Sequence, residues 1–114
     1  MSSPRFLDDE AFKCIRAGDM DGFRRVVEGR KIVDFSGADL RATDFRKIDM
    51  SKIVLHDAYL RDVDFRGCDL RQTDLEGASL HNAHIAGTYF PVNISPNEIQ
   101  LSIQQGTRLR VQTR

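Results

Sequence analysis

Several features are scarce or missing in this 114-residue sequence, and each absence removes a class of protein. No apolar run approaches the roughly 18 residues that a membrane-spanning helix needs, and no apolar signal-peptide core follows Met1. The two cysteines, Cys14 and Cys68, lack the spacing of a zinc site and are too few for a disulfide framework. We therefore expect a protein of the reducing cytoplasm, with no membrane partner.

An excess of charge of one sign is also missing, because 17 Lys and Arg balance 17 Asp and Glu. The net charge is +1 in residues 1–32, −3 in residues 33–92 and +2 in residues 93–114. No segment has the strong field of one sign that steers a protein onto nucleic acid. Direct binding to nucleic acid is therefore not expected.

A repeat of five residues runs from Val33 to Val92. The central apolar residues of its twelve units are Phe35, Leu40, Phe45, Met50, Leu55, Leu60, Phe65, Leu70, Leu75, Leu80, Ile85 and Phe90. A small or β-branched residue precedes each of them by two positions, so the two side chains lie on the same side of a short extended segment. A period of five fits neither a helix nor a single strand. A chain that turns at every unit and keeps its apolar residues inside winds into a solenoid.

Two stretches make the repeat specific. Ser36-Gly37-Ala38-Asp39-Leu40-Arg41 and Arg66-Gly67-Cys68-Asp69-Leu70-Arg71 resemble the A-(D/N)-L-x-x units of the pentapeptide-repeat family. The resemblance implies an all-β solenoid, a right-handed quadrilateral β-helix with four units in each coil, and a bacterial protein. Twelve units would form about three coils, with a height of only ~14 Å at the spacing of neighbouring strands.

Short helices are expected on both sides of the repeat within a single domain. The expected parts are an N-terminal helical cap (1–32), the β-helix (33–92), and a C-terminal capping helix with a basic tail (93–114). Acidic residues 8–10 favour a helix start and Gly18 favours its end. A second helix begins near Asp19 or Asp21 and closes at Gly29. Helices this short must bury an apolar side, and the first coil offers the nearest surface.

The C-terminal helix has a clear start, with Ser95 as N-cap, Pro96 at the first helical position and Glu98 completing a capping box. Ile99 and Ile103 share a face that we expect to cover the last coil. Leu101 points away from that face, so we take Leu101 as the candidate contact of a homodimer. The tail 107–114 is either an added strand or a disordered segment, and the sequence does not separate the two.

The outward residues of the repeat form columns twenty positions apart. Two neighbouring columns are rich in arginine, and the aspartates between them are expected to bond backbone groups or these arginines. Val54 and Tyr59 interrupt the aspartate series and expose an apolar pair. The candidate interaction face is therefore Arg41, Arg46, Val54, Tyr59, Arg61 and Arg66. The alternative is a solvated surface without a partner.

Enzyme and metal motifs are missing. The sequence contains no G-x-S-x-G, no Walker loop and no Cys–His pair with a placed partner. His56, His81 and His84 fall on three different faces of the expected β-helix. His81 and His84 flank a corner, but no third metal ligand is evident beside them. No catalytic residue, metal or cofactor is therefore predicted.

The sequence favours a non-catalytic interaction or scaffold module with an unidentified protein partner. The resemblance implies one alternative, a DNA-mimicking modulator of a type II topoisomerase (DNA gyrase). A DNA mimic needs a long, strongly acidic rod, because it imitates the phosphate charges along a duplex. The short coil, its net charge of −3 and its outward arginines argue against this alternative.

Overall fold

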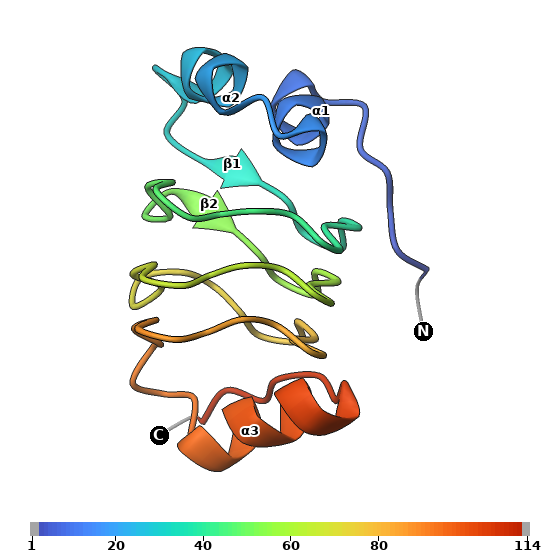
Figure 1. Cartoon of the computed structure of the whole chain (residues 1–114), viewed down its shortest axis with the longest axis vertical. Helices are drawn as coiled ribbons and strands as arrows, with labels where there is room; N and C mark the ends of the chain where they lie inside the picture. The colour runs from blue at the N-terminus through green and yellow to red at the C-terminus, as the bar shows by residue number, and fades with distance from the viewer. Residues whose placement is uncertain (1–2, 113–114) are drawn as a thin grey trace.

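In the computed structural model, which describes residues 3–112, the chain forms stacked turns with helices at both ends (Figure 1). The elements in chain order are α1 (Glu10–Ala17), α2 (Met20–Val27), β1 (Val33–Asp34), β2 (Ile53–Val54) and α3 (Pro96–Gln105). The helices α1 and α2 lie together at one end of the stack, and α3 lies at the other.

Residues twenty positions apart lie side by side in the stack. The strands β1 and β2 pair in parallel, with Val33 opposite Ile53. Isolated parallel bridges repeat this spacing at Asp39–Tyr59, Asp44–Asp64, Tyr59–Ser79, Asp64–His84 and Asp69–Tyr89. Within residues 3–112, β1 and β2 are the only strands, and each has two residues. Other units pair through isolated bridges, because each unit contributes only one or two residues to the pairing before the chain turns. The handedness and the number of coils stay predictions.

The corner between units uses left-handed backbone two residues after the central residue. Gly37, Gly67, Gly77 and Gly87 have φ between 67° and 76° there. The other residues with positive φ at this position are Ala42, Lys47, Asp57, Asp62 and Asn82. Glycine adopts this conformation without steric cost, and Asn and Asp tolerate it better than most residues. The corner thus explains why Gly, Asp or Asn occupies seven of these nine positions; Ala42 and Lys47 do not follow this preference.

The central residues fill the inside, which confirms the predicted register. The ten central residues from position 35 to position 80 are at most 2% exposed. Phe45 and Phe65 stack with ring centroids 5.1 Å apart. Cys68 is a buried core residue, and its Sγ donates to the carbonyl of Phe45 at 3.2 Å. Burial raises the pKa of this thiol to about 11.

The helices α1 and α2 cover the first turn of the stack. They begin after Asp9 and Asp19, whose carboxylates each accept a backbone N–H of the helix that follows. The rings of Phe12 and Phe23 lie 6.1 Å and 6.4 Å from the ring of Phe35. Both helices therefore bury their apolar side against the same core residue of the repeat.

The helix α3 begins after Ser95 and ends at Gly106, as predicted. Its buried residue is the polar Ser102, whose Oγ accepts from the N–H of Leu80 at 2.9 Å. Ile99 and Ile103 are only partly buried, so the expectation that their face covers the last coil is met only in part.

The tail explains why α3 covers less than expected. The tail adds one antiparallel bridge, in which Arg108 pairs with Ser79 and the N–H of Leu109 donates to the carbonyl of Ala78 at 2.8 Å. Leu109 is 1% exposed and takes part of the apolar surface that the helix would otherwise cover. Positions 113–114 of the expected tail lie outside the described residues.

The predicted capping box of α3 is formed only in half. Ser95 Oγ accepts from the N–H of Glu98 at 3.2 Å, but the Glu98 carboxylate accepts instead from the backbone and the guanidinium of Arg110 at 3.0 Å and 2.7 Å. Arg110 offers this carboxylate three N–H donors, one from its backbone and two from its guanidinium, whereas the capping box would offer the single backbone N–H of Ser95.

Candidate interaction face

One side of the stack is longer than the others because both ends of the chain add to it. Arg5 pairs in parallel with Ala38 at one end, and its backbone N–H donates to Gly37 at 3.0 Å. Arg108 pairs with Ser79 at the other end. We call this side the extended face and define it by Arg5, Asp39, Tyr59, Ser79 and Arg108. Hydrogen bonds on successive strands make it a rigid platform.

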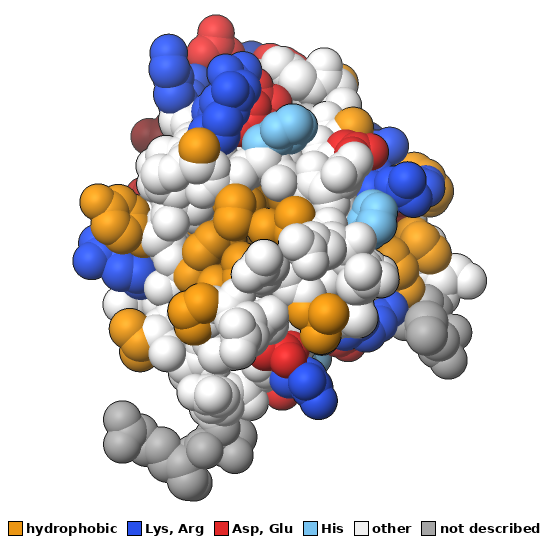
Figure 2. Space-filling view, turned by 60° about the horizontal axis from the view of Figure 1, so that its bottom comes forward, with side chains coloured by type: hydrophobic (Ala, Val, Ile, Leu, Met, Phe, Trp, Pro, Cys, Tyr) orange, Lys and Arg blue, Asp and Glu red, His pale blue; other side chains and the backbone are white. Residues whose placement is uncertain are grey.

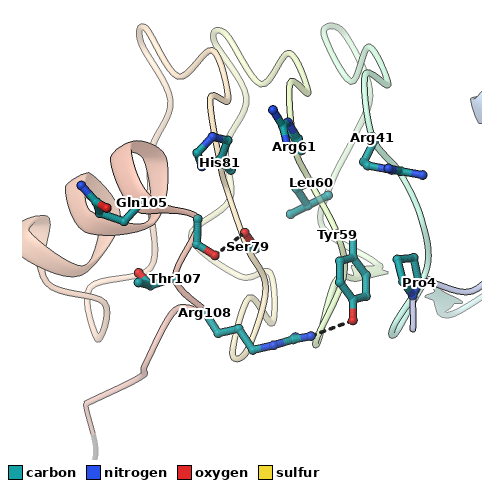
Figure 3. A pocket seen from close by; sticks show the side chains of 11 residues that line it. Pro4, Arg41, Tyr59, Leu60, Arg61, Ser79, His81, Gln105, Thr107 and Arg108 are labelled. Atoms are coloured by element: carbon teal, nitrogen blue, oxygen red, sulfur yellow. Dashed lines mark hydrogen bonds between the residues drawn. The ribbon is translucent and has the colours of Figure 1, made fainter. Parts of the chain in front are cut away.

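A hollow of about 570 Å³ lies along the extended face (Figure 3). We call it the basic hollow and define it by Arg41, Tyr59, Arg61, Ser79, His81 and Arg108. The end of α3, from Gln105 to Thr107, and Pro4 complete the lining. Among the lining residues that the structure describes there is no Asp or Glu, so the charged groups at the surface of this hollow are cationic.

Arg41 is the arginine of the hollow whose charge is already matched. Its Nε and Nη2 donate to the carboxylate of Asp39 at 2.8 Å and 2.6 Å. The Asp39 side chain is fully buried, and Arg16 approaches it to 3.9 Å. The hydrogen bonds from Arg41 hold the pKa of Asp39 below its usual range despite this burial.

Arg61 lacks such a partner. Tyr59 stands two residues before it, where Arg41 has an aspartate. The one carboxylate paired with Arg61 in the described part of the chain is Asp62, at 3.7 Å from Nε, which is beyond hydrogen-bond distance. The Arg61 side chain is 59% exposed. Its guanidinium therefore keeps N–H donors that another molecule can use.

Tyr59 and Arg108 hold each other in place. The Tyr59 hydroxyl accepts from Arg108 Nη2 at 2.8 Å (Figure 3), and the guanidinium carbon lies 5.0 Å from the ring centroid. Arg108 also donates to the carbonyl of Gly77 at 2.7 Å. The sequence reasoning missed Arg108, and the tyrosine in place of an aspartate was the signal that could have indicated a basic partner.

Two predicted residues, Arg46 and Arg66, lie on the neighbouring side, which we call the paired face together with Asp44 and Asp64. Arg46 binds Asp44 at 2.9 Å and approaches Asp64 to 3.3 Å, while Arg66 binds Asp64 at 2.6 Å. The hydrogen bonds from Arg66 lower the pKa of Asp64 to about 2. The charges of these arginines are thus neutralised within the repeat.

The remaining predicted residues lie elsewhere. Val54 belongs to β2, where it pairs with Asp34 on a third side of the stack. Leu101 lies on α3 and is 41% exposed. The structure therefore brings Arg41, Tyr59 and Arg61 into one site and separates them from the other candidates.

The α3 end of the molecule carries an apolar groove of about 450 Å³. Its apolar lining residues are Ile85, Phe90, Pro96, Ile99 and Ile103. Figure 2 shows hydrophobic side chains gathered at this end of the molecule. The groove exists because α3 seats Ser102, and not its isoleucines, at the centre of the contact.

Two structural findings bear on other classes of function. Between residues 3 and 112, no helix combines the length and the hydropathy required to cross a bilayer. The same part of the chain brings no three His, Cys, Asp or Glu side chains together as a metal site. His56 instead lies 3.3 Å from a carboxylate oxygen of Asp74.

The repeat is matched by a known family model. The model described as pentapeptide repeats matches eight copies, over residues 34–72 and 58–90. The two matches overlap and together reach from residue 34 to residue 90, which is half of the chain. No curated protein matches the sequence.

Proposed function

Because the chain belongs to the pentapeptide-repeat family, whose repeats imply a solenoid, we propose that it is a non-catalytic module that binds a protein partner through the extended face. The observation that carries the proposal is Arg61, an exposed guanidinium on a rigid ladder without a hydrogen-bonded carboxylate in the described chain. Arginine at a rigid surface is a frequent anchor of protein interfaces.

The carboxylates of the repeat support a non-catalytic role. Asp39, Asp44, Asp64 and Asp69 each accept hydrogen bonds from the arginine two residues later. These bonds lower the pKa of all four groups. A general base works best with a pKa near the operating pH, so these aspartates are poor candidates for proton transfer.

The same ion pairs weigh against the DNA-mimicking modulator of DNA gyrase. A DNA mimic must present uncompensated negative charges at the spacing of phosphates. In the repeat, Asp44 and Asp64 are matched by Arg46 and Arg66 at 2.6–3.3 Å. A protein-binding module therefore remains the better proposal.

The finer architecture is part of the proposal. We propose that residues 33–92 form a right-handed quadrilateral β-helix of about three coils, between a cap of residues 1–32 and a cap with tail of residues 93–114. The twenty-residue register of the bridges supports it. We also propose a cytoplasmic location in a bacterial cell, of which the free thiols of Cys14 and Cys68 support only the reducing compartment. A crystal structure would test hand and coil number directly.

We also propose a homodimer in which two copies meet through the α3 end. Leu101 is 41% exposed there, next to an end that carries the apolar groove. Contact between two copies at this end would remove Leu101 and the apolar groove from water. Leu101→Lys is expected to give a monomer in sedimentation velocity, whereas Val92→Lys, at a residue that is 97% exposed, should not. A dimer of unchanged mass for Leu101→Lys would show that this interface is wrong.

Affinity capture tests the proposed function. The full chain, Arg61→Gln and Arg66→Gln are each used to capture proteins from a bacterial lysate, with mass-spectrometric identification. We expect a partner that is retained by wild type and Arg66→Gln and lost by Arg61→Gln, because Arg66 donates to Asp64 whereas Arg61 makes no hydrogen bond to a carboxylate of the described chain. A partner retained by all three proteins, or lost equally by both variants, would contradict a role of the extended face.

A further inference from the structure

In this repeat, an arginine that directly follows a central residue has an aspartate two residues before it, with the single exception of Arg61. The arginines that directly follow a central residue are Arg41, Arg46, Arg61, Arg66 and Arg71. Four of them bind the aspartate two residues earlier, with the shortest contact at 2.6–2.9 Å in each pair. Arg61 follows Tyr59, and the Tyr59 hydroxyl accepts from Arg108. The tyrosine thus removes one carboxylate from Arg61 and adds a second guanidinium to the same hollow.

His81 continues the same column without an aspartate. Ser79 stands two residues before it, and the Ser79 hydroxyl donates to the carbonyl of Gly106 at 2.9 Å. Gly106 also leaves room for the imidazole, because a Cβ at this position would come within 2.9 Å of His81 Nδ1. Arg61 and His81 lie on successive strands, so their side chains start only ~4.8 Å apart.

We propose that the basic hollow binds a short acidic segment of a protein partner, with one carboxylate held between Arg61 and His81. This inference rests on the proposed function and names the chemistry of the partner. A guanidinium with unused donors can hold a carboxylate through two parallel hydrogen bonds. His81 supplies a further N–H donor. Arg108, whose guanidinium carbon lies 5.0 Å from the Tyr59 ring centroid, adds a guanidinium whose Nη1 is 3.9 Å from the carboxylate of Asp57.

The dimensions of the hollow fit an extended segment. The column from Arg41 to His81 covers two strand spacings, or about 10 Å, which is the length of about three extended residues. Pro4 closes the hollow at one end, and residues Gln105 to Thr107 close it at the other. A segment with a single well-placed carboxylate therefore fills the site.

The surroundings favour a peptide carboxylate over nucleic acid. Asp57 and Asp62 flank the hollow with side chains 48% and 47% exposed. They repel a nucleic-acid strand, which carries a phosphate at every nucleotide, more strongly than a peptide that brings a single carboxylate to Arg61, although Asp62 lies 3.7 Å from Arg61 Nε. The net charge of zero gives no long-range attraction for a polyanion.

Fluorescence anisotropy with a labelled peptide tests the inference. The probe is an extended peptide of about six residues, twice the length of the column, in which Glu and Thr alternate, and its control has Gln in place of Glu. The full chain is expected to bind the Glu peptide at least about tenfold more tightly than the Gln peptide at low salt. Arg61→Gln should lose this preference, and Arg66→Gln, the same change on the paired face, should keep it.

A second variant tests the rule of the repeat directly. Tyr59→Asp recreates the Asp–Arg pattern of positions 64 and 66, so the chain is expected to fold while Arg61 acquires its own carboxylate. Glu-peptide binding should weaken as much as in Arg61→Gln. Unchanged binding by Tyr59→Asp, equal binding of the Glu and Gln peptides, or displacement of the Glu peptide by inorganic phosphate or oligothymidylate at lower concentration would each overturn the inference.

The inference and the proposed function can fail separately. A lysate partner that needs Arg61 but is not displaced by the Glu peptide would keep the interaction face and reject its acidic ligand. Binding of the Glu peptide to Arg61 without any partner dependent on the extended face would reject the proposed function and keep the site.

Discussion

The paired face and the extended face are built from the same repeat, yet Arg66 on the paired face is hydrogen-bonded to a carboxylate and Arg61 beside the extended face is not. Arg66 is bound to Asp64 at 2.6 Å and shares it with Arg46 at 3.3 Å. Arg61 lies 3.7 Å from the exposed Asp62 and makes no hydrogen bond to it. A single exchange of aspartate for tyrosine in the repeat therefore separates an arginine that stabilises the fold from one that can serve a partner.

The inside of the stack does not share this difference. Leu60 and Phe65, the central residues next to Arg61 and Arg66, are both fully buried. The outward positions can therefore change without altering the packing beneath them, as expected of a stack in which the core contacts of each unit point inward. Stability and recognition are carried by different residues of the same five-residue unit.

The largest loss of unfolding free energy is expected for a core residue beneath the paired face. Phe65→Ala removes a fully buried ring that stacks on Phe45, and should lower the free energy of unfolding by about 3–5 kcal/mol. Urea titration followed by circular dichroism measures this loss. Val92→Ala, at a residue that is 97% exposed, is the control and should change little. A loss below about 1 kcal/mol for Phe65→Ala would contradict the role of the stacked rings.

A smaller loss of unfolding free energy is expected when the carboxylate of Asp64 on the paired face is removed. Asp64→Asn keeps an acceptor for the backbone N–H of Arg66 but removes the charge shared by two arginines. The side chain is 16% exposed, and the loss near neutral pH should be about 1 kcal/mol.

The pH dependence of the stability difference between wild type and Asp64→Asn tests whether the charge of Asp64 causes that difference. The pKa of Asp64 is lowered to about 2, so the unfolded chain takes up the proton first as the pH falls. The stabilisation by Asp64 is complete above the ordinary Asp pKa of about 4 and is lost progressively between about pH 4 and pH 2. The difference between wild type and Asp64→Asn in urea titrations should shrink over this window. A constant difference would show that the charge does not matter.

Local and periodic features were predictable from the sequence. The five-residue period placed the core residues, and the caps at Asp9, Ser95 and Gly106 follow from side-chain and backbone preferences that act within a few residues. The missing aspartate before Arg61 is equally visible in the sequence.

Contacts between distant residues were not predictable in the same way. Arg108 meets Tyr59 across 49 positions, and the bridge between Arg108 and Ser79 likewise joins residues that are distant in the sequence. The Glu98 half of the capping box failed for the same reason, because Arg110 reaches Glu98 from outside the helix. Such contacts depend on where the fold brings the two partners and not on either local sequence.

The smallest effect is expected at Arg61, and it is the sharpest test of the comparison. Arg61→Ala removes no hydrogen bond that the described structure makes, so the free energy of unfolding should stay within about 0.5 kcal/mol of wild type. Arg66→Ala, the matched change on the paired face, removes hydrogen bonds to Asp64 and should lower the free energy of unfolding measurably more than Arg61→Ala does. The two variants are compared in parallel urea titrations at low salt, where exposed ion pairs contribute most. Equal losses of unfolding free energy would mean that Arg61 stabilises the fold as Arg66 does. The extended face would then have no arginine that is available to bind a partner without a cost to the fold.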